Sequence, residues 1–285
     1  MRADELVEVA ARTLGASPAI DHWQSDRDLL DAQELLDHVL GREFHPEEEI
    51  ARPVRRRFER LVDRRATGEP IPYIKGYSEF RGLRVPARPG VFVPRDSTEF
   101  LAAQAIRRLR RRRHPVAVDL ATGGGPVALA IANEVPGASV YGTDIAADAV
   151  ALARTSARKL GLTAHFVRGD LLDGLPRALA GSVDVITLHP PYVAQGELRH
   201  LPDEVRRFEP VHTLTDHSVD GLGLVERAAS EGGTWLSPGG WLLVEVSPDR
   251  ARGVATRLRQ AGFVDVRSTK DDAFKVTRVI VGKRP

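Results

Sequence analysis

The sequence predicts an α/β fold in which a largely parallel sheet carries helices on both faces and follows a small helical domain. From about residue 99 onward, strand-like apolar stretches alternate with helix-like stretches, which is typical of a parallel sheet with crossover helices. Over residues 1–66 the apolar residues recur at helical spacing. Glycines and prolines punctuate short apolar segments over 67–98, which indicates strands and turns, such as a hairpin. We therefore expect a helical domain over 1–66, a hairpin or linker over 67–98 and an α/β domain over 99–285.

In the helical region, Leu6, Ala10 and Leu14 lie one helical turn apart, and a second apolar set follows over residues 29–40. Pro46 comes directly before three glutamates, and a proline followed by acidic residues is favoured in the first turn of a helix. The sequence therefore predicts that a new helix begins at Pro46.

The α/β region contains seven strand candidates, and five helices are expected around and between them. The last two strands are joined only by residues 269–274, which predicts an antiparallel hairpin at an edge of the sheet. The expected strands cover residues 116–120, 139–144, 164–168, 183–188, 241–246, 263–268 and 275–281, and the expected helices lie near 126–135, 146–160, 174–180, 220–236 and 249–261.

Composition excludes several classes of protein. The chain has no cysteine, so disulfides, thiolate metal sites and a cysteine nucleophile are excluded. No apolar run approaches the roughly 20 residues that cross a bilayer. The acidic, helix-like first residues lack the features of a secretory signal, which predicts a cytoplasmic protein. The 41 Lys and Arg residues nearly balance the 39 Asp and Glu residues, which disfavours a nucleic-acid partner.

Two runs of arginine, residues 55–57 and 107–113, stand out against this balance. Charge runs are usually solvated helix faces or ends, and contact with RNA phosphate or an acidic partner is the alternative.

A glycine loop follows the first strand of the α/β region. Residues 118–126 read Val-Asp-Leu-Ala-Thr-Gly-Gly-Gly-Pro and lead into a helix, where a ligand can approach the backbone and the free amides of a helix N-terminus. Asp144 ends the next strand, where a carboxylate can accept hydrogen bonds from both hydroxyls of a ribose. The glycine spacing differs from G-x-G-x-x-G, so the pattern favours a nucleoside site without a pyrophosphate over a purely structural turn. Asp170, after the third strand, can bond an adenine amino group or cap the next helix.

A second motif, His189-Pro190-Pro191-Tyr192, follows the fourth strand. The carboxyl ends of parallel strands lie at one edge of a sheet, so this loop is expected near the glycine loop. The two prolines restrict the directions of the backbone carbonyls, and Tyr192 offers an aromatic face to a planar group. The pattern indicates a binding corner rather than a rigid surface turn.

Together these motifs resemble the class I methyltransferases that use S-adenosylmethionine, and more narrowly the glutamine methyltransferases that modify translation release factors. The resemblance implies a Rossmann-like sheet of seven strands in the order 3-2-1-4-5-7-6, S-adenosylmethionine as the cofactor and a release factor as the protein partner. It covers nearly the whole chain and includes residues 68–76, 94–99, 208–210, 220–222 and 244–246.

The resemblance also implies roles for individual residues. In the family, the corresponding loop reads Asn-Pro-Pro-Tyr, and the asparagine oxygen and the first proline carbonyl accept the two N–H groups of the substrate amide. This arrangement aims the nitrogen lone pair at the sulfonium methyl, so catalysis comes from positioning and electrostatics. The implied catalytic residues are His189, Pro190 and Tyr192; the cofactor-binding residues are Asp119, Ala121, Thr122, Gly123, Gly125, Asp144, Ile145, Asp170, Leu171 and His189; the substrate-binding residues are Arg95, Glu99, Pro191, Tyr192 and Glu209.

The chain departs from the family at two of these positions. His189 stands where the family has Asn, and Ala121 stands where it usually has Gly. A neutral imidazole can replace Asn as a hydrogen-bond acceptor, or it can act as a general base for an amine, hydroxyl or guanidine on a small molecule or another protein. A third interpretation is a cofactor-binding homologue that performs no transfer.

The remaining candidates have structural alternatives. Arg95 and Glu99 can instead form an ion pair at a helix start, and Glu209 can order a loop. The histidines after Tyr192 are spaced irregularly, and no metal site is predicted.

Overall fold

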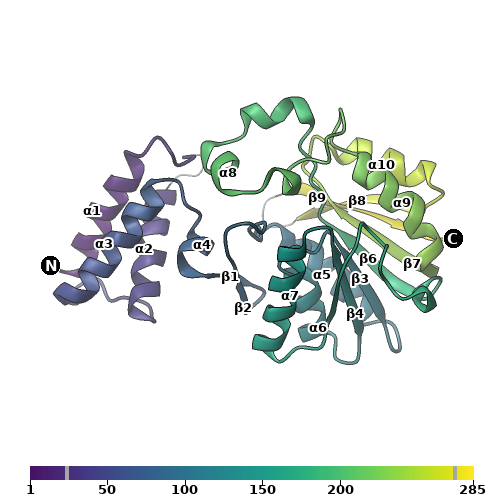
Figure 1. Ribbon diagram of the computed structural model, residues 1–285, viewed down its shortest axis with the longest axis horizontal. Coiled ribbons are helices and arrows are strands. Elements are labelled where there is room, and N and C mark those ends of the chain that lie inside the picture. Colours follow the sequence, from purple (N-terminus) through teal and green to yellow (C-terminus); the bar gives the residue numbers. More distant parts are fainter. Residues whose placement is uncertain (23–25, 272–274) are drawn as a thin grey trace. The chain divides into compact units, whose positions relative to one another are not determined.

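A computed structural model describes residues 1–22, 26–271 and 275–285 (Figure 1). The chain forms two compact units. The helical unit comprises Met1–Ser78, Ala87–Pro89 and His200–Glu209. The sheet unit comprises Glu79–Pro86, Gly90–Arg199 and Pro210–Pro285.

Amphipathic helices build the helical unit. Its apolar core is formed by residues such as Leu6, Leu35 and Phe58, each buried on the inner face of its helix. Burial of these side chains, at about 1.5–3 kcal/mol each, is the main force that holds the unit together. The helices are α1 (Ala3–Gly15), α2 (Arg27–Leu40), α3 (Arg52–Ala66), α4 (Ile71–Lys75) and α8 (Asp203–Phe208).

The helix expected to begin at Pro46 is absent from the described chain, because residues 46–49 have another role. The carbonyl of Pro46 accepts the backbone N–H of Asp4, and the carbonyl of Glu48 accepts that of Ala3. These bonds satisfy amides at the start of α1 that have no partner within the helix. The next helix, α3, therefore begins only at Arg52.

Helix α8 belongs to the helical unit although it follows the fourth strand of the sheet by some fifteen residues in sequence. Its Glu204 accepts hydrogen bonds from Arg27 at 2.9 Å and from Arg65 at 3.0 Å. Arg65 is 1% exposed and also donates to Asp31 at 2.6 Å. A buried guanidinium thus joins α2, α3 and α8.

The sheet unit contains the predicted seven-stranded sheet, in the order β5-β4-β3-β6-β7-β9-β8. Counted from β3, this is the order 3-2-1-4-5-7-6. The first five strands are parallel, while β9 runs antiparallel to both β7 and β8, so the expected edge hairpin is confirmed; residues 272–274 of its connection lie outside the described residues. The strands are β3 (Val116–Leu120), β4 (Ser139–Asp144), β5 (His165–Arg168), β6 (Val183–Leu188), β7 (Leu236–Glu245), β8 (Val264–Asp271) and β9 (Val276–Lys283).

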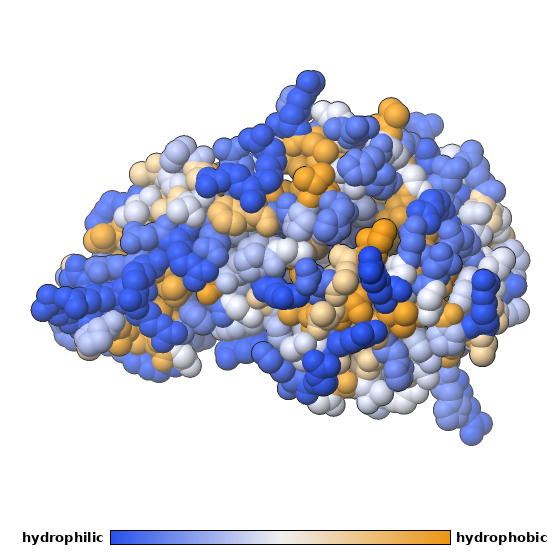
Figure 2. Space-filling view, viewed as in Figure 1, coloured by the Kyte–Doolittle hydropathy of each residue, from blue (hydrophilic) through white to orange (hydrophobic). Residues whose placement is uncertain are grey.

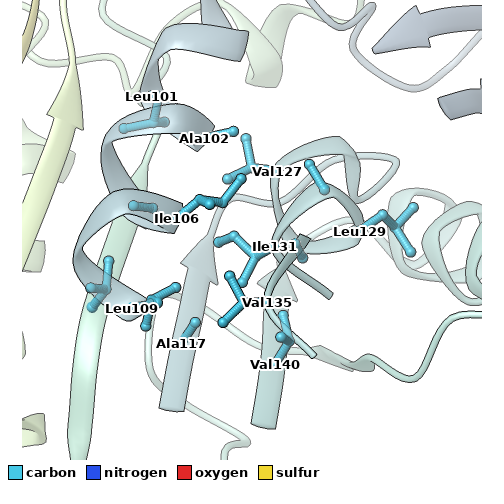
Figure 3. Close-up of a cluster of buried hydrophobic side chains, with 14 of the residues drawn as sticks. Leu101, Ala102, Ile106, Leu109, Ala117, Val127, Leu129, Ile131, Val135 and Val140 are labelled. Carbon is cyan, nitrogen blue, oxygen red and sulfur yellow. The ribbon is translucent and has the colours of Figure 1, made fainter. Parts of the chain in front are cut away.

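Helices cover both faces of this sheet, as parallel strands require. Side chains of α5 and α6, including Ile106 and Ile131, pack against Ala117 of β3 and Val140 of β4 (Figure 3). A separate apolar cluster joins the opposite face to α9 and α10. The helices are α5 (Thr98–Leu109), α6 (Pro126–Glu134), α7 (Ala147–Leu160), α9 (Gly223–Trp235) and α10 (Ala251–Gln260).

Several short segments differ from the expectation. The expected helix over 174–180 is only a 3₁₀ turn, Arg177–Leu179, because Gly174 has a positive φ of 85° and Pro176 follows it. Within 67–98, the strands β1 (Tyr77–Phe80) and β2 (Leu83–Pro86) form the expected hairpin, but α4 precedes it. Pro72 fits the first turn of α4, and Gly76 ends it in the left-handed conformation. Two further 3₁₀ turns cover Gln195–His200 and Val211–Thr213.

Polar side chains cover most of the face shown in Figure 2, and apolar side chains lie among them in small groups. No helix within the described ranges is long and apolar enough to cross a bilayer.

Candidate functional site

A cavity of about 280 Å³ lies in the sheet unit, where the loops after β3, β4, β5 and β6 meet. The two motifs singled out from the sequence, the glycine loop and the His-Pro-Pro-Tyr loop, both line it. The predicted site residues that line the cavity are Asp119, Ala121, Thr122, Gly123, Asp144, Ile145, Asp170, Leu171, His189 and Pro191. Gly125, Pro190 and Tyr192 adjoin lining residues in the chain but are not part of the lining.

The loop after β3 is anchored by Asp119, a residue near the end of that strand. Its carboxylate accepts hydrogen bonds from the hydroxyls of Thr122 at 2.6 Å and Thr187 at 2.7 Å. Burial raises the pKa of Asp119 to about 6, although these hydrogen bonds oppose the shift. Asp119 therefore fixes the loop to β6 at the cavity floor.

Three residues of this loop, Ala121, Gly123 and Gly125, have backbone conformations that favour glycine. Ala121 has a φ of 51°, in the left-handed region. Gly125 has a φ of 86°, and a Cβ there would lie 2.9 Å from the ring of Phe166. Gly125 is thus required by packing, whereas Ala121 adopts its conformation at an energetic cost.

Asp144 joins the end of β4 to the glycine loop. One carboxylate oxygen accepts the Gly123 N–H at 2.9 Å, and the other accepts the Ala146 N–H at 2.9 Å. Burial raises the pKa of Asp144, and the two backbone hydrogen bonds oppose this. Each oxygen retains one lone pair, so the carboxylate can accept two more hydrogen bonds from a ligand.

The side of the cavity after β4 and β5 combines apolar and charged groups. Ile145 is 60% exposed, which is unusual for a large apolar side chain and provides a face for a planar ligand. Asp170 pairs with Arg227 of α9 at 2.8 Å, with both side chains largely exposed. The hydroxyl of Thr143 donates to the Leu171 carbonyl at 2.6 Å and fixes the backbone beside Asp170.

His189 is enclosed by residues from three segments. Its Nδ1 lies 3.1 Å from the Thr98 hydroxyl and 3.4 Å from an Oε2 of Glu245, at the end of β7. The ring meets Phe92 edge-on with centroids 5.3 Å apart, and stacks on Tyr192 at 5.9 Å with 15° between the planes. Burial lowers the pKa of His189, Glu245 opposes that shift and Arg95 adds to it, so the ring is neutral near pH 7.

Tyr192 is fixed by its backbone and by burial. It forms an isolated antiparallel bridge with Thr215, and the next residue, Val193, donates its N–H to the Leu214 carbonyl. Burial raises the pKa of Tyr192, so its hydroxyl stays protonated near neutral pH. The ring thus serves as a rigid aromatic face beside His189.

The predicted substrate-binding residues outside these loops are spread more widely. The guanidinium of Arg95 lies 4.8 Å from the centre of the Phe92 ring, close to His189. The carboxylate of Glu99 accepts the backbone N–H of Arg81 at 2.6 Å and thereby fixes the turn between β1 and β2. Glu209 is buried and belongs to the helical unit.

Sequence reasoning did not assign Thr98, Phe92 or Glu245 to the site. Glu245 carried a usable signal, because a charged residue at the end of an apolar strand is also what indicated Asp144. Its proximity to His189 depends on β7 lying beside β6, which the order of the strands provides.

The second arginine run forms a separate hollow of about 370 Å³ at the end of α5. The Arg108 guanidinium lies 4.7 Å from the Trp241 ring centre, and Gln104 accepts hydrogen bonds from Arg107 and Arg108. Burial and neighbouring arginines lower the pKa of Arg108 to about 10. These residues cap and cover the end of a helix, as charge runs commonly do.

Comparison with known proteins places the chain among methyltransferases. A family model described as "Methyltransferase small domain" matches residues 82–203, and one described as "PrmC N-terminal domain" matches residues 16–76. The chain is 36% identical to the release factor glutamine methyltransferase of Bordetella pertussis over 85% of this chain and 90% of that protein. It is also 36% identical to the protein of that name from Burkholderia pseudomallei, over 97% of this chain and 96% of the relative.

A solved structure shares the fold. The 16S rRNA methyltransferase of T. thermophilus, in complex with AdoMet and guanosine, has a TM-score of 0.52 at 18% identity, covering 73% of this chain and 50% of that one. At this identity the likeness concerns the fold alone.

Proposed function

The chain belongs to the family of release factor glutamine methyltransferases, and on this premise we propose that it transfers a methyl group from S-adenosylmethionine to the side-chain amide of a glutamine in a translation release factor. The observation that carries the proposal is the meeting of the glycine loop and the His-Pro-Pro-Tyr loop at one cavity, in a chain related to these enzymes over nearly its full length.

The cavity suits the proposed cofactor. The two remaining lone pairs of the Asp144 carboxylate match the two hydroxyls of a ribose. The exposed apolar face of Ile145 and the carboxylate of Asp170 would receive the adenine. When bound, S-adenosylmethionine supplies a methyl group on a positively charged sulfur, which is the electrophile of the reaction.

His189, Pro190 and Tyr192 would hold the acceptor. An amide nitrogen is a poor nucleophile because its lone pair is delocalised into the carbonyl. Two acceptors, the neutral His189 ring and the Pro190 carbonyl, would bind its two N–H groups and hold the lone pair toward the methyl. Tyr192, stacked parallel to His189, would pack on the amide plane.

Each of the three regions of the chain would have its own role in the reaction. We propose that the helices over 1–66 recognise the release factor, that the hairpin over 67–98 connects them, and that residues 99–285 form the domain that binds cofactor and performs transfer. Residues Arg95, Glu99, Pro191 and Glu209 remain proposed substrate contacts.

The direct test is transfer of label from S-adenosylmethionine to purified release factor. We expect one labelled glutamine, identified by mass spectrometry, and no label on a release factor whose target glutamine is replaced by alanine. Calorimetric titration with S-adenosylmethionine accompanies the assay. Binding without transfer to any release factor would contradict the proposal and favour the non-catalytic alternative.

One observation favours a second candidate function. The Glu245 carboxylate next to Nδ1 of His189 resembles the support that general-base histidines receive, and removal of a proton helps an amine or hydroxyl acceptor on a small molecule or another protein.

The substitution His189→Asn separates the two functions. If the acceptor is an amide, activity on release factor should be kept within about threefold or rise, because Asn offers the same kind of hydrogen-bond acceptor. If His189 is a general base, activity should fall at least about a hundredfold. The measurement is kcat for each acceptor, with circular dichroism to verify folding.

A further inference from the structure

Glu245 is a buried acid whose environment points to a specific partner. It is 3% exposed and lies at the end of β7. One oxygen accepts the Ser97 hydroxyl at 2.8 Å. The other, Oε2, has no hydrogen-bond partner within the described residues, and Nδ1 of His189 lies 3.4 Å from it. A buried carboxylate oxygen without a donor is costly, so this one requires a proton nearby.

Neutral histidine carries a proton on one of its two ring nitrogens. If Nδ1 held a lone pair, that lone pair would face the negative Oε2 at close range and repel it. If Nδ1 holds the proton, the N–H faces both Oε2 and the Thr98 hydroxyl oxygen, which can accept it. Electrostatics therefore favours the proton on Nδ1.

The other ring nitrogen is then an acceptor. Within residues 1–22, 26–271 and 275–285, no hydrogen bond engages Nε2, and the ring lines the cavity. A ring nitrogen with a lone pair that reaches the cavity offers a substrate what the amide oxygen of asparagine offers.

We propose that Glu245 is a positioning residue that holds His189 in the Nδ1-protonated form, so that Nε2 presents a fixed acceptor for an N–H of the methyl-accepting group. This inference rests on the proposed function and deepens it, because it explains how histidine serves at a position where the family has asparagine. It also limits the acceptors to groups that can donate an N–H or O–H at this point. The opposite tautomer would present a donor to the same group and block it.

The first experiment determines the proton position without substrate. Two-bond ¹H–¹⁵N spectra of the full-length, histidine-labelled protein at pH 7.5 distinguish the two tautomers, and the His189→Asn spectrum identifies the His189 signal. We expect a protonated Nδ1. A protonated Nε2 in the wild-type protein would overturn the proposal, whatever the enzyme methylates.

A second experiment separates the carboxylate from the hydroxyl. Thr98→Val removes the hydroxyl and leaves Glu245, so we expect Nδ1 to remain protonated. If the Thr98 hydroxyl oxygen, rather than Glu245, is the acceptor that holds the proton on Nδ1, the proton should move to Nε2 in this variant, which would contradict the role of Glu245.

A third experiment follows activity against pH. The charged and titratable groups around the ring are Glu245 from β7, Arg95 from the loop before α5 and Tyr192 from its own loop. Protonation of His189 converts Nε2 into a donor, so kcat should fall as the pH drops through the pKa of the ring. Glu245→Gln removes the charge that raises this pKa. The acidic limb of the pH profile should therefore move to lower pH. In addition, kcat at pH 7.5 should fall about tenfold or more, because the proton is no longer held on Nδ1 and part of the protein carries it on Nε2.

Two comparisons keep this experiment decisive. Glu134→Gln removes a carboxylate that pairs with Arg81 in the same unit, and we expect the acidic limb to stay in place. Glu245→Gln in the His189→Asn background should have little further effect on kcat, since no imidazole remains to be oriented. An equal loss in both backgrounds, with an unmoved acidic limb, would show that Glu245 serves only to stabilise the fold. Tautomer control without methylation of any release factor would reject the proposed substrate and leave this inference standing.

Discussion

Individual residues in the cavity differ in how well their backbone suits them. Ala121 adopts a φ of 51°, where an L-residue other than glycine pays about 1–2 kcal/mol. The position lines the cavity, and it is one of the two at which the chain departs from the family, which usually has glycine there. The strained backbone thus lies in the loop that contacts the cofactor in the proposed function.

Ala121→Gly should stabilise the protein. Relief of the left-handed backbone outweighs the greater freedom of glycine in the unfolded chain, so the free energy of unfolding should rise by about 0.5–1 kcal/mol. Urea denaturation measures the change. Ala180→Gly is the matched control, because Ala180 is an exposed loop residue with a φ of −59°, where glycine should lower stability. A loss of stability in both variants would show that Ala121 is not strained.

At the scale of elements, a network of buried ion pairs joins three helices of the helical unit, α2, α3 and α8. Arg65 of α3 reaches Asp31 of α2 and Glu204 of α8 from a side chain that is 1% exposed. Removing a single partner from such a network leaves charges buried without compensation. The adjacent Arg64 pairs with Glu69 at the surface, where an ion pair contributes little.

Arg65→Ala should therefore lower the free energy of unfolding of the helical unit by about 3–5 kcal/mol. Arg64→Ala, one residue away on the same helix, should cost less than about 1 kcal/mol. Thermal unfolding followed by circular dichroism compares the two. Equal costs would mean that the Arg65 network contributes no more than a surface pair.

At the scale of the whole molecule, most of the strands and loops that position the site could be predicted from the sequence. Alternating apolar segments were sufficient for the seven strands, and each loop motif followed a strand end, so His189 and Asp144 could be expected at one edge. The placement of Glu245 beside His189 required β7 to pair with β6 in register, which no local pattern encodes. The attachment of α8 to the helical unit depends on Glu204 meeting Arg27 and Arg65 across more than a hundred residues, and short-range patterns carry no record of such pairs.

The helical unit should not reach full stability as an N-terminal fragment. Residues 1–78 lack Glu204, so Arg65 and Arg27 lose a carboxylate partner. We expect this fragment to melt at a lower temperature than the same unit in the full chain. Joining residues 200–209 to it through a flexible Gly-Ser linker should recover part of the difference, as measured by calorimetry. If the fragment melts at the same temperature as the unit in the full chain, α8 is dispensable for the stability of the unit.

The excursion of residues 200–209 into the helical unit also bears on how such proteins can be recombined. A fusion that exchanges only the first 78 residues between relatives would combine one parent's bundle with the other parent's α8, and the Glu204 carboxylate would face a foreign set of cations. Functional chimeras should therefore arise most readily when residues 1–78 and residues 200–209 are taken from the same parent. The two stretches should be exchanged together although 121 residues separate them.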